Sequence, residues 1–173
     1  MKKSEITEFT EYFEYYINLN EDVELMDMFD KSIEQIEDIN IEQLKRIGLK
    51  TYAVGKWTVN EIIQHLTDWE RIWIYRTILA VRNEGTIPCG HDHNIMVVNS
   101  NANELPINQL LAELRAVRSA TIAMFGTFNH EILVSNCKFN NNQMSVLAMG
   151  FNIIGHQIHH FNIIKERYIP LVV

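Results

Sequence analysis

The feature that most constrains the fold is a C-terminal stretch, residues 145–168, that is apolar nearly all round when it is drawn as a helix. Ser145 is suited to be its N-cap, and Pro170 prevents it from continuing. A helix without a polar face has to be buried, so we expect this one at the centre of the fold. Gly150 and Gly155 each cost about 1 kcal/mol relative to alanine inside a helix. Their presence predicts that a neighbouring segment packs too closely there to admit a side chain.

Helical spacing of apolar residues also accounts for most of the remaining chain, and no strand pattern competes with it. Besides residues 145–168, helices are expected over residues 4–19, from Asn20 as N-cap through Ile36, and over residues 40–48, 58–80 and 106–125. The economical architecture is all-α: an up-and-down bundle of four main helices with an extra short helix.

The helix at residues 58–80 has the clearest start in the chain. Thr58 and Glu61 have the spacing of a capping box, and Trp57 and Ile62 occupy the positions of a hydrophobic staple. The capping box explains a glutamate at position 61, although a catalytic role for Glu61 stays open. His65 then lies at the edge of the apolar face.

Residues 83–105 are expected to form a loop, because they contain glycine, proline and several asparagines. A connection of more than about 15 residues without regular structure is uncommon in a compact domain and is often a lid or a binding loop. The role of this segment stays open.

Composition narrows the class of protein. With 173 residues, of which 47% are hydrophobic, the chain can bury one core, and we expect residues 1–173 to form a single domain. A net charge of −7 gives no basic footprint for nucleic acid or for an anionic membrane surface. We find neither a secretory signal nor an apolar run of the ~18 residues that a membrane span needs, so a cytoplasmic protein is expected. Cys89 and Cys137 are too few for a disulfide framework.

Three histidines form a candidate metal site. His156 and His160 lie four residues apart, so both imidazoles project from one face of the last helix, and His65 offers a third from another helix. Three imidazoles would leave open positions on a divalent transition metal, with zinc or nickel as the first choices. The alternative is that these are partly buried core histidines with hydrogen-bond partners.

Other polar residues have weaker claims. His159 is rotated about 100° from His160 around the helix, and His91 and His93 stand in a loop, so we do not expect these three to be ligands; His130 has even less claim. Asp68, one turn after His65, could orient its ring or be an exposed acid. The arginines at positions 71, 76, 115 and 118 are expected to pair with helix acids; the alternative is that they line the mouth of a pocket.

Two segments carry a resemblance to a known family. They are the run GKWTVNEIIQHLTDWER at residues 55–71 and the run HQIHH at residues 156–160. In order and separation they resemble the DinB-like family, in particular its YfiT-like metal-dependent hydrolases, and the similarity extends over residues 12–171. The resemblance implies a helical bundle in which His65, His156 and His160 bind a metal.

Three functions stay open. The first is a metal-dependent hydrolase that uses metal-bound water; the second is a thiol S-transferase that acts on electrophiles with a low-molecular-weight thiol; the third is a non-catalytic metal-binding protein linked to stress. We expect a small-molecule substrate, and a homodimer stays open. No nucleophile elbow, phosphate-binding loop or dinucleotide fingerprint occurs, so no catalytic or organic-cofactor residue is assigned.

Overall fold

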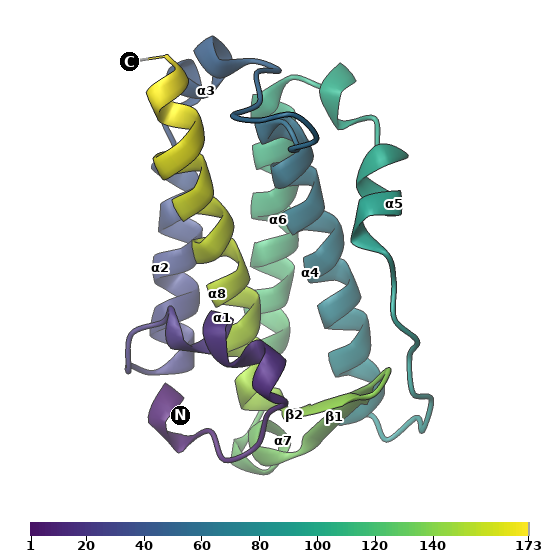
Figure 1. Cartoon of the computed structure of the whole chain (residues 1–173). Helices are drawn as coiled ribbons and strands as arrows, with labels where there is room; N and C mark the ends of the chain where they lie inside the picture. The colour runs from purple at the N-terminus through teal and green to yellow at the C-terminus, as the bar shows by residue number, and fades with distance from the viewer. Residues whose placement is uncertain (173) are drawn as a thin grey trace.

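The computed structural model describes residues 1–172, and four long helices run side by side along most of its length (Figure 1). They are α2 (Leu25–Glu37), α4 (Val59–Val81), α6 (Ile107–Phe125) and α8 (Val146–Ile163). Each packs against two of the others, in the circular order α2, α6, α4, α8. The predicted all-α four-helix bundle is confirmed.

Helix α8 is central, as its composition predicted. Every residue from 146 to 157 is buried, and the helix begins after Ser145, whose hydroxyl accepts a hydrogen bond from the backbone N–H of Ala148. A π-helical turn, η4 (Ile164–Tyr168), and a 3₁₀ turn, η5 (Ile169–Leu171), complete its path. Pro170 lies in η5, so the helical path ends close to the proline, as the sequence predicted.

Close packing against α8 explains its two glycines. A Cβ added at Gly155 would lie 1.9 Å from the carbonyl oxygen of Tyr16, and one added at Gly150 would lie 2.8 Å from the Leu25 side chain. Tyr16 belongs to a short helix, α1 (Glu14–Asn18), which therefore rests directly on α8.

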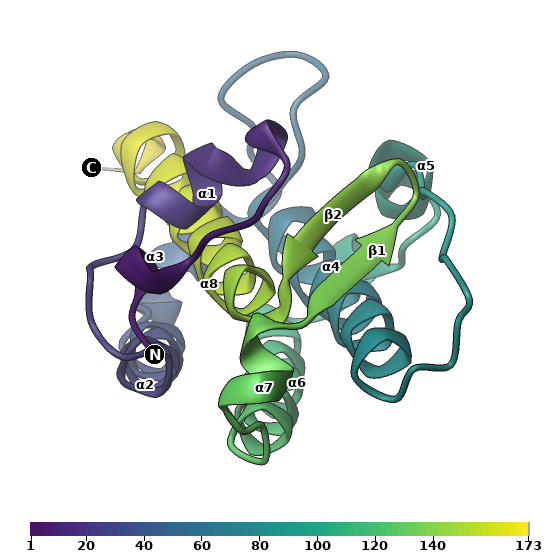
Figure 2. The same ribbon diagram turned by 90° about the horizontal axis from the view of Figure 1, so that it is seen from below.

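The remaining elements are short. They are the helices α3 (Ile41–Ile47), α5 (His93–Val98) and α7 (His130–Val134), the 3₁₀ turns η1 (Lys3–Glu5), η2 (Glu11–Phe13) and η3 (Ala102–Glu104), and the strands β1 (Asn136–Phe139) and β2 (Asn142–Ser145). The two strands form an antiparallel hairpin at one end of the bundle (Figure 2). The segment between α4 and α6 runs back along the bundle, so that these two helices point in the same direction (Figure 1).

The caps predicted from local sequence are present. Thr58 Oγ1 accepts a hydrogen bond from the backbone N–H of Glu61, and the Glu61 carboxylate accepts one from the backbone N–H of Thr58. Asn40 caps α3 through the backbone N–H of Gln43. Both helices begin where the sequence placed them.

The helix predicted for residues 4–19 is wrong over most of that range. Only α1 is α-helical there, because the preceding residues pair with the hairpin instead. The backbone N–H of Thr10 donates to the carbonyl of Gln143, and Phe9 forms an antiparallel bridge with Met144. The hairpin itself was not predicted, since no strand was expected anywhere in the chain.

Two further boundaries are corrected. Asn20 is not the N-cap of α2, which begins at Leu25; its buried amide instead donates to three backbone carbonyls, including that of Phe151 in α8. Residues 83–105 are not all loop, because Asp92 caps α5 by accepting from the backbone N–H groups of Asn94 and Ile95. Within residues 1–172, no helix has both the length and the apolar character required to cross a membrane.

Candidate metal centre

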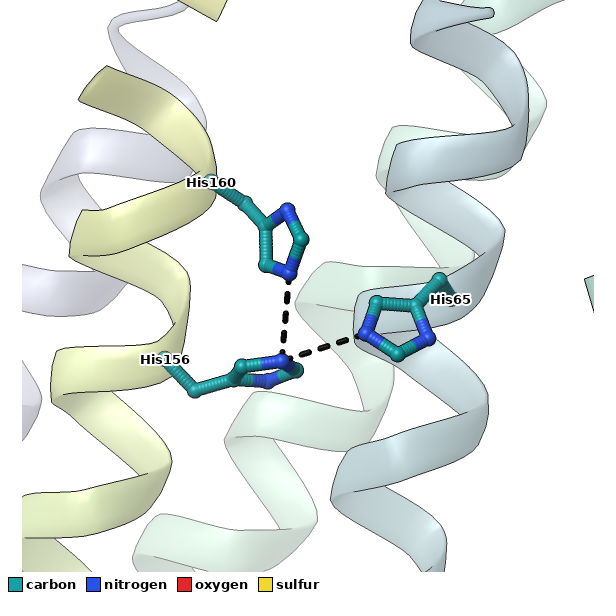
Figure 3. A group of neighbouring side chains, drawn as sticks. All are labelled: His65, His156 and His160. Carbon is teal, nitrogen blue, oxygen red and sulfur yellow. Dashed lines mark hydrogen bonds between the residues drawn. The ribbon is translucent and has the colours of Figure 1, made fainter. Parts of the chain in front are cut away.

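Three imidazoles meet between α4 and α8 (Figure 3). His65 projects from α4, and His156 and His160 project from successive turns of α8. The Nε2 atom of His156 lies 3.1 Å from that of His65 and 3.2 Å from that of His160. One nitrogen from each ring lies within 4.8 Å of the other two. The structure thus brings together the three histidines that the sequence singled out.

Burial keeps these imidazoles neutral. Together with the charges of the neighbouring His93 and His159, which contribute less, it lowers the pKa of His65 to about 3. Burial, followed by the charges of nearby histidines, also holds the pKa of His156 and of His160 well below the usual range. A neutral imidazole has the free lone pair that a metal ligand needs.

The three rings fit a metal ion. Nitrogens that each bind one ion at about 2.0–2.1 Å are about 3–3.5 Å from one another, which matches the observed Nε2 separations. Without a cation, a pair of nitrogens this close requires a proton between them, because two lone pairs repel. A single ion satisfies all three lone pairs, and imidazole nitrogen suits a divalent transition metal.

A pocket of ≈ 580 Å³ opens beside the three histidines. Two tryptophans flank the imidazoles: the ring centroid of Trp57 lies 4.9 Å from that of His65, and the centroid of Trp69 lies 5.5 Å from it. Aromatic and polar side chains line the remainder, among them Tyr12, Phe13, Tyr16, Trp73, Arg76, Phe139, Asn140 and Asn152.

The other histidines fall into two groups. His91, His93 and His159 line the same pocket, but none belongs to the cluster of three. His93 is exposed at the rim, and its ring centroid lies 5.9 Å from that of His65. The fourth, His130, is exposed at the start of α7. Sequence reasoning assigned no function to residues 83–105, yet this segment supplies Gly90, His91 and His93 to the pocket wall.

No carboxylate lines this pocket among the residues that the structure describes. Glu61 is held in the capping box, where its other oxygen accepts a hydrogen bond from Asn103. Asp68 accepts from the Gln64 amide and lies 3.6 Å from Arg71, so it does not orient the His65 ring. That possible role of Asp68 is wrong, because the carboxylate points to helix partners and not to the imidazole.

The predicted pairing of the arginines holds for three of the four. Arg71 pairs with Glu113 at 2.7 Å, Arg115 with Glu37 at 2.5 Å and Arg118 with Glu70 at 2.9 Å. For Arg76 the alternative holds: it lines the pocket, where it is buried, and has no ion-pair partner within residues 1–172. Sequence reasoning also missed Asn152, although it stands one helical turn before His156 on the same face.

Comparisons with known proteins indicate the family and the fold of the chain. A family model described as "DinB superfamily" matches residues 25–164. A curated protein of Oceanobacillus iheyensis named "Putative metal-dependent hydrolase" is 23% identical over 133 residues, which are 76% of this chain and 74% of that protein. A solved structure, YfiT from Bacillus subtilis, is described as "a probable metal-dependent hydrolase with an unusual four-helix bundle topology". It aligns with a TM-score of 0.63 at 17% identity, covering 92% of this chain and 87% of its own. This second likeness shows a shared fold.

Proposed function

The chain belongs to the DinB superfamily, and from this we propose that it is a metal-dependent hydrolase of a small molecule, with His65, His156 and His160 as the metal ligands. One observation carries the proposal: three buried, neutral imidazoles converge at one end of a pocket of ≈ 580 Å³. The name of the Oceanobacillus relative supports the same class of activity.

A divalent ion such as zinc or nickel is the proposed cofactor. Three protein ligands leave coordination positions open toward the pocket, which is the arrangement of catalytic sites. When bound, such an ion would supply Lewis-acid polarisation and lower the pKa of a coordinated water.

The side chains around the ion would then orient the substrate and accept the proton that the reaction releases. Trp57 and Trp69 pack beside the imidazoles, limiting water around them and restricting the orientation of a substrate. With no carboxylate in the described pocket wall, the role of proton acceptor falls to a histidine. His159 lies closer to the cluster, but its Nδ1 shares a hydrogen bond with the Tyr15 hydroxyl. We therefore assign this role to His93, which is exposed at the rim with its ring centroid 5.9 Å from that of His65.

Metal content after dialysis tests the ligand assignment. We expect the parent to retain zinc or nickel, and His65→Ala, His156→Ala and His160→Ala each to lose it. The loss of affinity should exceed the ~10–100-fold that typically follows removal of an outer hydrogen-bond partner. His159→Ala is the matched control, because it removes a pocket histidine adjacent to His160 that does not reach the cluster. Equal retention by His159→Ala and His160→Ala would refute the assignment.

A second function, transfer of a low-molecular-weight thiol to an electrophile, is favoured by the missing carboxylate. A thiol whose pKa is lowered beside a metal ion attacks as thiolate, so it needs no strong carboxylate base. Consumption of a panel of esters and alkylating electrophiles by the metal-loaded protein, with and without added thiol, separates the two functions. Turnover only with thiol would replace hydrolysis by transfer, and metal binding without any turnover would favour a non-catalytic metal-binding protein.

A further inference from the structure

Away from the three histidines, the same pocket holds a group of buried polar side chains whose hydrogen-bonding capacity the protein leaves unused. Arg76, Trp73 and Asn152 are 4%, 5% and 1% exposed, and all three line the pocket. Among residues 1–172, the Nε atom of Arg76, the indole N–H of Trp73 and both amide atoms of Asn152 find no hydrogen-bond partner. Buried polar atoms of native proteins rarely lack partners, so such a concentration around one pocket points to a ligand.

Two buried arginines of this chain make the contrast clear. The Arg118 guanidinium, 1% exposed, forms two hydrogen bonds of 2.9 Å to the Glu70 carboxylate. Within the described residues 1–172, the Arg76 guanidinium makes a single hydrogen bond, from Nη2 to the carbonyl of Cys89 at 3.2 Å. It otherwise lies over the rings of Trp73 and Phe139, at 4.8 and 4.6 Å from their centroids.

An unpaired buried charge is expensive. Moving a cation out of water costs several kcal/mol unless a partner of opposite charge compensates it. Ring faces and one carbonyl compensate it only in part, and burial lowers the pKa of Arg76 accordingly. A negatively charged ligand group would supply the missing compensation.

Arg76, Trp73 and Asn152 are positioned so that one ligand can contact both them and the three histidines. Along α8, Asn152 precedes His156 by one turn, about 6 Å of helix rise; along α4, Trp73 follows His65 by eight residues, about 12 Å. The two helices pack against each other, so both ends of the pocket face one continuous space. The Arg76 guanidinium lies over the Trp73 ring, so an elongated ligand in this space could reach from the imidazoles to Arg76.

We propose that Arg76, Trp73 and Asn152 form an anion subsite that binds a carboxylate on the small molecule whose reacting group lies at the three histidines. The inference rests on the proposed function for the role of the histidines and adds the class of substrate, an elongated carboxylate. The guanidinium, the indole N–H and the Asn152 amide N–H are donors, and a carboxylate only accepts. The Asn152 carbonyl then takes a neighbouring hydroxyl or N–H of the same molecule.

Binding of a carboxylate and of its neutral amide to metal-free protein tests the subsite. We would compare 4-phenylbutanoate with 4-phenylbutanamide by titration calorimetry, after chelation has removed any ion that could itself bind the carboxylate. We expect the carboxylate to bind roughly 10- to 100-fold more tightly than the amide, and Arg76→Gln to abolish that preference, since hydrogen bonds to charged groups contribute in this range. Trp73→Phe, which removes the indole N–H, should weaken it.

Two controls separate this inference from the metal site. Arg71→Gln removes a surface arginine of the same helix that already pairs with Glu113, and should keep the preference. His65→Ala should also keep it, so that failure of the metal proposal leaves this test intact. Equal affinities for carboxylate and amide in the parent, no carboxylate binding, or a preference that survives Arg76→Gln would overturn the subsite. Tighter binding of inorganic phosphate than of the carboxylate would overturn the choice of a carboxylate.

Thermal unfolding distinguishes a ligand-binding Arg76 from a structural one. Replacing a buried, unpaired cation by an apolar residue of similar length removes a desolvation cost, so Arg76→Met should unfold at or near the parent's midpoint. Arg118→Met leaves Glu70 buried without its cation and should unfold at a clearly lower temperature. Equal losses in the two variants would mean that Arg76 serves the fold.

Discussion

Burial decides the protonation of the individual histidines in the cluster. An imidazole in water takes up a proton near pH 6.5, but His65, His156 and His160 are each less than one tenth exposed and face one another. Charging any one of them would cost desolvation and repulsion from the others. The fold therefore keeps three neutral imidazoles with free lone pairs at neutral pH and also below pH 6.5, where imidazoles in water become charged.

This arrangement predicts acid sensitivity of the metal-free protein. The pKa of His65 is about 3 in the folded chain and about 6.5 in the unfolded one. Between these values the unfolded chain binds more protons, so the free energy of unfolding is fully retained above pH 6.5 and falls as the pH drops toward 3. In urea unfolding of chelated protein between about pH 7 and pH 4, His65→Asn should lose stability less steeply than the parent. The exposed His130→Asn should follow the parent, and parallel curves for all three proteins would contradict the prediction.

Sequence could supply the three histidines but not the anion subsite. The spacing of His156 and His160 is a local property of one helix, a second predicted helix offers His65, and the match of two segments to a known family implies that the three act together. Whether Arg76 pairs with an acid depends on which carboxylates the folded bundle brings near it, which no local pattern contains. Glu70 sits on the same helix as Arg76 yet pairs with Arg118 of α6.

At the scale of single elements, the contact between α1 and α8 fixes one wall of the pocket. Tyr16 of α1 lines that wall, and its ring lies 5.6 Å from the ring of His156. The backbone of the same residue rests on Gly155, the residue just before this histidine. The glycine thus sets how closely the N-terminal segment approaches the metal centre.

Replacing Gly155 by a residue with a Cβ should therefore lower the stability of the fold and disturb the metal centre. It would lie 1.9 Å from the Tyr16 carbonyl oxygen, a backbone atom that can move only with α1. Overpacking of this kind typically costs about 1–3 kcal/mol, and here it outweighs the ~1 kcal/mol gain in helix propensity. We expect Gly155→Ala to lower the free energy of unfolding in urea and the affinity for zinc.

Gly150→Ala is the matched control on the same helix. Its Cβ would meet methyl groups of Leu25 at 2.8 and 2.9 Å and the ring of Phe125 at 3.1 Å, which are side-chain atoms that can shift without moving a backbone segment. The gain in helix propensity then offsets part of the repacking cost, so this variant should stay closer to the parent. A Gly150→Ala variant that is as destabilised as Gly155→Ala would show that the backbone contact is not the decisive one.

The elements that sequence predicted well are those whose signals are local. The caps of α3, α4 and α8 need only a side chain and a backbone N–H three residues later, so Asn40, Thr58 and Ser145 revealed them. The N-terminal segment and the hairpin depend on pairing between Thr10 and Gln143, which lie far apart in sequence. Helical periodicity near residue 9 was overridden by this long-range pairing.

At the scale of the whole molecule, the path of the chain between the helices decides which residues line the pocket. The long segment after α4 returns along the bundle before α6 begins (Figure 1). It contributes Gly90, His91 and His93 to the lining of the pocket. A chain of strictly alternating helices with short connections would leave that side open. The periodicity of the sequence predicted the helices, but the path between α4 and α6 follows from packing that no short window contains.

The position of the histidines between two helices leads to a prediction for the stability of the whole fold. Because α4 supplies His65 and α8 supplies His156 and His160, an ion bound by all three would hold together two helices that separate on unfolding. Binding to the folded state alone adds about 2.7 kcal/mol at a free metal concentration 100 times the Kd. For a chain of this length, that corresponds to a rise in Tm of roughly 5–10 °C.

Thermal unfolding of chelated and of zinc- or nickel-loaded protein measures this coupling. The rise in Tm should depend on metal concentration in the parent and in His130→Ala, whose substituted histidine lies on α7 away from the pocket. It should be largely absent in His65→Ala, where the link from α4 is missing although His156 and His160 remain. A metal-dependent rise of equal size in His65→Ala would mean that α8 alone binds the ion, in which case the metal would not join the two helices and the three-histidine centre would be wrong.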